Sequence, residues 1–230
     1  MDLKKRRQAE IIFLSLAAVF IAALVTANLI FQKFFHWNPF GIYEFELSVG
    51  IIPYPVTFLV TDIISEIYGR KMANRVVFAG LFASLFTLLI IVVASTAPAT
   101  DWSPITNTQF DRVFGFTFIA VAASLTAYLL AQFLDVQIFH FWKRLTKGKD
   151  LWFRNNASTF SSNFVDTFVV LLLLCSFKVI GWDRFGYLLL NGYLFKVMVA
   201  LLDTPIIYVI VYFIRKHFNL KGYGAELNIG

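Results

Sequence analysis

Charged residues are scarce in this chain, and their scarcity is the first constraint on its class. Only 15% of the 230 residues are Asp, Glu, Lys or Arg, whereas 59% are hydrophobic and 18% are aromatic. A soluble domain of this length carries more charge and interrupts its apolar runs more often. Apolar stretches of about 20 residues recur along the whole chain, which is typical of helices that cross a bilayer core of roughly 30 Å. The sequence therefore predicts a polytopic membrane protein with no separate soluble domain.

The sequence has only one cysteine and none of the common catalytic motifs considered below. The single cysteine, Cys175, lies in an apolar run, which excludes an intramolecular disulfide and a multi-cysteine metal site. The sequence contains no H-E-x-x-H zinc pair, no G-x-S-x-G nucleophile elbow, and neither a G-x-x-x-x-G-K-[ST] nor a G-x-G-x-x-G nucleotide loop. We therefore expect no enzymatic activity, no cofactor and no metal, and no ATP handled by this chain alone.

The net charge of +6 does not indicate nucleic-acid binding, because the basic residues gather at the ends of apolar runs. Fifteen of the 20 Lys and Arg residues fall within four segments, residues 4–7, 70–75, 143–154 and 215–221. With the spans given below, all four segments lie on one side of the membrane. The positive-inside rule then places both termini in the cytoplasm.

Six transmembrane helices are predicted, in an all-α membrane protein with a single domain covering residues 1–230. The predicted spans are residues 11–31, 49–68, 76–97, 113–142, 157–180 and 187–214. A cleavable signal peptide at the N-terminus is the less favoured alternative, because its apolar part exceeds the usual core of about 7–15 residues. The second and fifth spans carry Thr61-Asp62 and Asp166-Thr167, which allows a 3+3 arrangement of inverted halves, as in many secondary transporters.

The predicted spans contain five acids, Asp62, Glu66, Asp135, Asp166 and Asp203, and one lysine away from the span ends, Lys196. A charge at the bilayer centre costs about 2.5–3.5 kcal/mol on insertion scales, so such residues face the bundle interior or a wet cavity. Neutral polar residues continue this pattern at helical spacing: Gln132 with Asp135, and Ser158, Thr159, Ser162 and Asn163 with Asp166. The sequence predicts a polar stripe lining a cavity. Hydrogen bonding between helices is the alternative for each neutral residue.

Two prolines, Pro53 and Pro55, fall near the start of the second span. Proline removes an amide donor and clashes with the preceding turn, so either a break with a new helix start or a simple kink is expected there. Pro205 in the last span raises the same question. Glu66 has a structural alternative to a binding role, since Arg70 or Lys71 four and five residues later could pair with it.

Three motifs occur in order across nearly all of the membrane portion. They are D-x-x-x-E-x-Y-G-[RK]-[RK] within Pro55 to Gly80, A-Q-x-x-D-V within Tyr128 to Arg144, and S-x-x-x-x-N-x-x-D-T within Asn155 to Phe168. Together with Phe195-Lys196, these motifs resemble the queuosine-precursor transporter family, also called the VUT or ECF-like vitamin uptake family. The family's polar positions correspond here to Asp62, Glu66, Gln132, Asp135, Ser158, Asn163 and Asp166.

The resemblance implies uptake of a 7-deazaguanine, such as 7-cyano-7-deazaguanine, through a bacterial inner membrane. A guanine-like edge presents two parallel donors, which a carboxylate accepts as it accepts Arg. We therefore expect Asp62 or Asp166 to bind that edge. The remaining predicted substrate-binding residues are Glu66, Gln132, Asp135, Ser158, Asn163 and Lys196, with Tyr54, Phe58 or Phe160 stacking on the ring.

Secondary active transport is the favoured mechanism. A substrate-binding subunit energised by a separate ATPase module is the main alternative, and an intramembrane enzyme is a weaker one. The expected partners are the small-molecule substrate and the lipid bilayer, and a homodimer is also considered.

Overall fold

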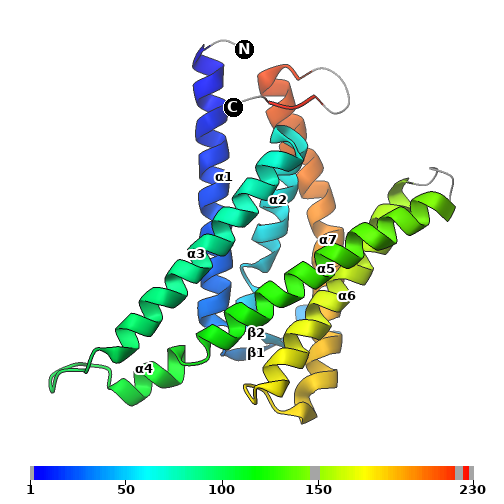
Figure 1. Ribbon diagram of the computed structural model, residues 1–230. Helices are drawn as coiled ribbons and strands as arrows, with labels where there is room; N and C mark the ends of the chain where they lie inside the picture. Colours follow the sequence, from blue (N-terminus) through cyan, green and yellow to red (C-terminus); the bar gives the residue numbers. More distant parts are fainter. Residues whose placement is uncertain (1–2, 146–150, 221–224, 228–230) are drawn as a thin grey trace. The chain divides into compact units, whose positions relative to one another are not determined.

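The computed structural model of the protein describes residues 3–145, 151–220 and 225–227, and helices dominate the described part. The elements, in chain order, are α1 (Leu3–Ile30), β1 (Phe34–Trp37), the 3-10 helix η1 (Pro39–Gly41), β2 (Phe45–Ser48), the 3-10 helix η2 (Val49–Ile51), α2 (Tyr54–Tyr68), α3 (Arg70–Thr96), α4 (Asn107–Phe114), α5 (Thr117–Leu145), α6 (Leu151–Ser176) and α7 (Trp182–Phe218) (Figure 1).

Five helical segments in the described residues are long and apolar enough to cross a membrane: Leu3–Ile30, Val49–Tyr68, Lys71–Thr96, Asn107–Ala131 and Trp182–Phe218. The fifth predicted span corresponds to α6, whose described apolar part, Phe160–Ser176, is shorter. The prediction of a helical multi-pass membrane protein is therefore confirmed. The side of the membrane on which each terminus lies remains a prediction.

Two local elements were not predicted from the sequence. Strands β1 and β2 pair antiparallel, with Phe34 opposite Ser48 and Trp37 opposite Phe45, so the chain is not entirely α-helical. The alternation in β2 buries Phe45 and Leu47, at 8% and 2% exposure, which is the period-two pattern of a strand with one packed face. In addition, α4 is a separate short helix before α5, and a Thr106–Gln109 capping box starts it.

Two compact units make up the chain. The first unit consists of Met1–Lys33, Val49–Ala94 and Val199–Gly230, and the second of Phe34–Ser48 and Ser95–Met198. Helix α7 therefore supplies its N-terminal part to the second unit and its C-terminal part to the first. These units differ from two halves of three successive spans each, because both units contain segments from early and late parts of the chain. The predicted inverted symmetry of two three-span halves remains a prediction.

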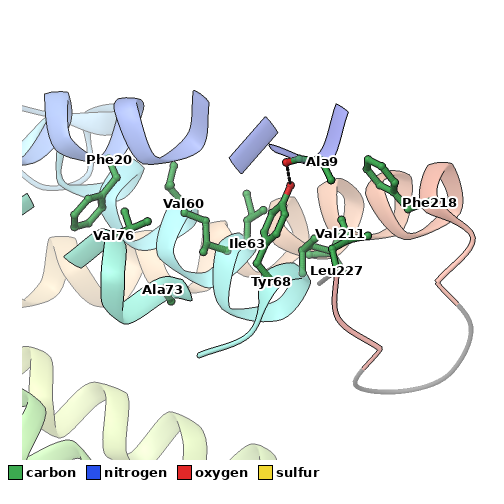
Figure 2. Packing of buried hydrophobic residues seen from close by; sticks show 12 residues of the cluster. Ala9, Phe20, Val60, Ile63, Tyr68, Ala73, Val76, Val211, Phe218 and Leu227 are labelled. Carbon is green, nitrogen blue, oxygen red and sulfur yellow. Dashed lines mark hydrogen bonds between the residues drawn. The ribbon is translucent and has the colours of Figure 1, made fainter. Parts of the chain in front are cut away.

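The core of the first unit joins α1, α2, α3 and the end of α7. Figure 2 shows Val60 and Ile63 of α2 among residues from these helices, and the Tyr68 hydroxyl donates to the backbone oxygen of Ala9 at 2.8 Å. Where η2 meets α1, a Cβ on Gly50 would lie 2.7 Å from the backbone oxygen of Ala27. Only glycine allows so close an approach of the two backbones.

In the second unit α5 and α6 lie side by side (Figure 1). Helix α6 ends where Lys178 takes a positive φ of 59°, while the amides of Lys178 and Val179 donate to the backbone oxygens of Cys175 and Leu174. This pair of bonds is the Schellman arrangement, which satisfies the last carbonyl groups of a helix. The chain then turns back into α7, so that α6 and α7 meet inside the unit.

Candidate functional site

A buried ion pair joins α6 and α7 in the second unit. The ammonium Nζ of Lys196 in α7 lies 2.5 Å from the carboxylate Oδ2 of Asp166 in α6, and the two side chains are 9% and 14% exposed. A charge inside a spanning helix is tolerated when it finds an opposite charge. The structure thus brings together two of the residues predicted from sequence, and their charges balance each other.

Small and polar residues occur on both helices within one turn of this pair. Asn163 and Thr167 of α6 are each 7% exposed, and the Thr167 hydroxyl donates to the Asn163 backbone oxygen at 2.8 Å. On α7, a Cβ at Gly192 would lie 3.2 Å from the Thr167 methyl group. The helices therefore approach closely beside Asp166, and glycine at position 192 permits that approach.

A second group of predicted residues follows one face of α2 in the first unit. Tyr54, Phe58, Asp62 and Glu66 recur at steps of four, which places them along one side of a helix. The rings of Tyr54 and Phe58 make an edge-to-face contact with centroids 4.6 Å apart. The core of the first unit does not cover this face, because Phe58, Asp62 and Glu66 are exposed. A face with two carboxylates is unsuited to hydrocarbon, so it requires polar surroundings.

The two carboxylates on this face differ in their partners. Glu66 is 53% exposed and pairs with Arg215 of α7 at 3.1 Å. An ion pair near the helix end was the structural alternative for Glu66, and the partner that the structure gives it is Arg215 of α7. The side chain of Arg70, one of the two predicted partners, lies outside the described part of the structure. Asp62, one turn earlier, lies near enough to Asp203 of α7 for the two carboxylates to repel each other when both are charged. One carboxylate oxygen of Asp203 is buried and has no hydrogen-bond partner among the described residues.

The two proline positions behave differently. Helix α2 begins at Tyr54, directly after Pro53, which confirms a new helix start there. Pro205, by contrast, lies within α7, which runs without interruption from Trp182 to Phe218. The helix therefore continues from Asp203 through Pro205 without a break.

Four of the predicted residues remain outside these two groups. The side chains of Gln132, Asp135 and Ser158 lie outside the described part of the structure, although all three positions are helical. Phe160, at the start of the described part of α6, is half-buried. Stacking of an aromatic ring on a substrate stays a prediction for Tyr54, Phe58 and Phe160.

Sequence reasoning missed Asn191 in α7, which is completely buried. Its amide oxygen accepts a hydrogen bond of 2.8 Å from the hydroxyl of Tyr43, a residue between η1 and β2. Asn191 carries no charge, so a search for ionisable residues inside spans does not find it. The sequence feature that could have drawn attention to Asn191 is its position in the same predicted span as Lys196, five residues earlier.

A multi-pass helical protein with charged side chains inside its spans has the features of a membrane transport protein. Residues 48–210 match a family described as "Putative vitamin uptake transporter". The chain belongs to this family, which comprises transporters and not enzymes.

Three curated relatives cover most of the chain. A "Probable queuosine precursor transporter" of Bacillus subtilis is 29% identical over 73% of this chain and 72% of its own length. A protein of the same description from Haemophilus influenzae is 28% identical over 87% of this chain and 85% of its own. The "Queuosine precursor transporter" of Escherichia coli is 28% identical over 83% of this chain and 77% of its own. No solved structure matches the chain.

Proposed function

We propose that this protein imports a queuosine precursor, a 7-deazaguanine such as 7-cyano-7-deazaguanine, across the bacterial cytoplasmic membrane. The family assignment and the names of the three relatives support transport of this class of compound. The buried charged groups supply the chemistry that such a cargo requires.

The observation that carries the proposal is the ion pair of Asp166 and Lys196 inside α6 and α7. A guanine-type edge offers a ring N–H beside an exocyclic amine, and a carboxylate accepts two such parallel donors. The cargo edge therefore takes over part of the hydrogen bonding that Lys196 provides to Asp166. In the absence of cargo, Lys196 neutralises the carboxylate, which lowers the cost of keeping it inside the membrane.

The exposed face of α2 is the alternative contact surface for the cargo in this proposal. Asp62 lies one turn beyond Phe58 and two turns beyond Tyr54, so the same helix face presents an acid and two rings. A planar heterocycle stacks on such rings with about 1–3 kcal/mol per base in nucleic-acid systems. Asp62 is the alternative to Asp166 as the carboxylate that binds the guanine-type edge.

The carboxylate assignment is tested by Asp62→Asn and Asp166→Asn in cells that depend on uptake of the precursor. A carboxylate that accepts both donors of the edge cannot be replaced by an amide, so at least one variant is expected to lose about tenfold or more in uptake. Asp183→Asn is the matched control, because the Asp183 side chain is 78% exposed. Wild-type uptake by both Asp62→Asn and Asp166→Asn at normal membrane levels would show that neither carboxylate binds the cargo.

We further propose that transport is secondary active and needs no ATPase module. The test is uptake of labelled 7-cyano-7-deazaguanine into liposomes that contain only this protein, under imposed proton or sodium gradients. Uptake that rises with one gradient supports the proposal. Uptake that requires an added ATPase module would instead identify this chain as a substrate-binding subunit.

A further inference from the structure

Asn191 is a buried polar side chain of α7 that takes no part in the ion pair of Asp166 and Lys196. It is 0% exposed, and its amide nitrogen Nδ2 has no hydrogen-bond partner among the described residues. An unsatisfied buried donor costs free energy, so native proteins keep few of them. A side chain retained in this state is a good candidate for a group that pairs with a ligand.

The orientation of the amide is set by Tyr43. The Tyr43 hydroxyl donates to Oδ1 of Asn191 at 2.8 Å, so the oxygen side of the amide is occupied and the two N–H groups point the other way. The Tyr43 ring makes an edge-to-face contact with Phe45, with centroids 4.7 Å apart. Phe45 belongs to β2 and is itself buried, so the Tyr43 ring packs against a side chain that is held within the fold.

Three further contacts fasten the β1–β2 hairpin to the same helix. Arg184 lies 3.3 Å from Glu46, the Tyr187 hydroxyl donates to the backbone oxygen of Glu44, and Phe195 contacts the ring of Trp37. With Asn191, the α7 positions follow steps of three, four and four, which describes one helix face. The hairpin thus holds the Tyr43–Asn191 bond in place along a face of α7.

Asn191 lies next to the contact between α6 and α7 that carries the Asp166–Lys196 pair. The next residue, Gly192, packs against Thr167, which directly follows Asp166 in the chain. Lys196 lies five residues further along α7, a rise of about 7.5 Å. A planar bicyclic ligand bound at Asp166 has a size comparable with this separation.

We propose that Asn191 is a further cargo-contacting residue and that its amide N–H group donates to the ring carbonyl oxygen of the 7-deazaguanine. Tyr43 is a positioning residue that fixes the direction of the amide. This inference rests on the proposed function. In a guanine-type ring the carbonyl is adjacent to the N–H edge, so a carboxylate for the edge and an amide donor for the carbonyl form one recognition site.

The test compares uptake of two probes, 7-deazaguanine and 7-deaza-6-thioguanine, into vesicles that hold only this protein. The thio compound keeps the N–H edge but replaces the carbonyl oxygen with a weaker acceptor. The wild type is expected to prefer the oxo probe by about fivefold, the worth of one ordinary hydrogen bond. Asn191→Leu and Asn191→Ala are expected to bring this ratio close to one, and Tyr43→Phe is expected to reduce it.

Tyr187→Phe is the matched control, because it also removes a hydroxyl that fastens the hairpin to α7 but does not touch Asn191. Its oxo-to-thio ratio is expected to stay at the wild-type value. Asp166→Asn is expected to lower uptake of both probes and to leave the ratio unchanged.

A wild type that transports both probes equally, or an Asn191 variant that keeps the wild-type ratio, would overturn the role of Asn191. An unchanged ratio in Tyr43→Phe would overturn the positioning role of Tyr43. A wild type that takes up neither probe would instead refute the proposed function itself.

Discussion

The Asp166–Lys196 pair gives the sharpest test of whether buried charge in this protein serves function or only stability. The perturbations are Asp166→Asn, Lys196→Met and the double variant. Because the two side chains are only 14% and 9% exposed, each single change leaves one charge in a poorly hydrated place. Removing one partner of a buried ion pair costs about 3–5 kcal/mol, and we expect about 3 kcal/mol for each single variant.

The double variant is expected to be more stable than either single one. Without charge on either side, no desolvated ion remains, and replacing a buried pair with neutral groups is often close to neutral. The free energy of unfolding in mixed detergent micelles should therefore show a coupling of about 2 kcal/mol or more between the two positions. Arg184→Met serves as a control because its side chain is 57% exposed, so the expected loss is below about 1 kcal/mol.

Uptake measured on the same variants separates the two roles. If Asp166 binds cargo, the double variant recovers stability but not transport of 7-cyano-7-deazaguanine. Absence of coupling would refute the energetic reasoning about a desolvated pair. Wild-type transport by the double variant would refute the role of Asp166 in binding and leave the pair as a purely structural contact.

Three further predictions concern the first unit. Gly50→Ala should lower the free energy of unfolding by about 1–3 kcal/mol, because the added methyl group would meet the α1 backbone. Gly186→Ala is the control and should not lower it, because a methyl group there meets no other atom. Unfolding in detergent measures both variants. Tyr68→Phe should cost about 1 kcal/mol in the same assay, since it removes a buried hydrogen bond to α1, and equal stability would show that the bond contributes nothing. Glu66→Gln breaks a partly exposed ion pair with Arg215 and should change stability by less than about 1 kcal/mol; a strong loss of uptake at normal stability would instead assign Glu66 to the cargo.

Local pattern was enough to predict most of the helices. Long apolar runs specify spans, because each turn of a helix satisfies its own backbone in lipid. The two prolines at positions 53 and 55 left a new helix start and a simple kink open, and the structure shows the new start, at Tyr54. Ionisable residues inside spans stood out without any structure, and they include Asp62, Asp166 and Lys196. The resemblance in the three motifs led to the family that residues 48–210 confirm.

Partnership between distant residues required the tertiary structure. Glu66 pairs with Arg215, which is 149 residues away, because packing of α2 against α7 decides which charge is near. The hairpin was missed for a related reason, since its strands are only four residues each and are held by pairing and by contacts with α7.

By itself, the sequence determined that this is a helical membrane protein of an uptake family with acids and one base inside its spans. Hydrophobicity and helical period are properties of neighbouring residues, so they can be read along the chain. Only the tertiary structure decided that Lys196 neutralises Asp166 and that Tyr43 orients Asn191. Those choices depend on which helix faces meet, and the energy of a buried polar group depends on the partner it meets there.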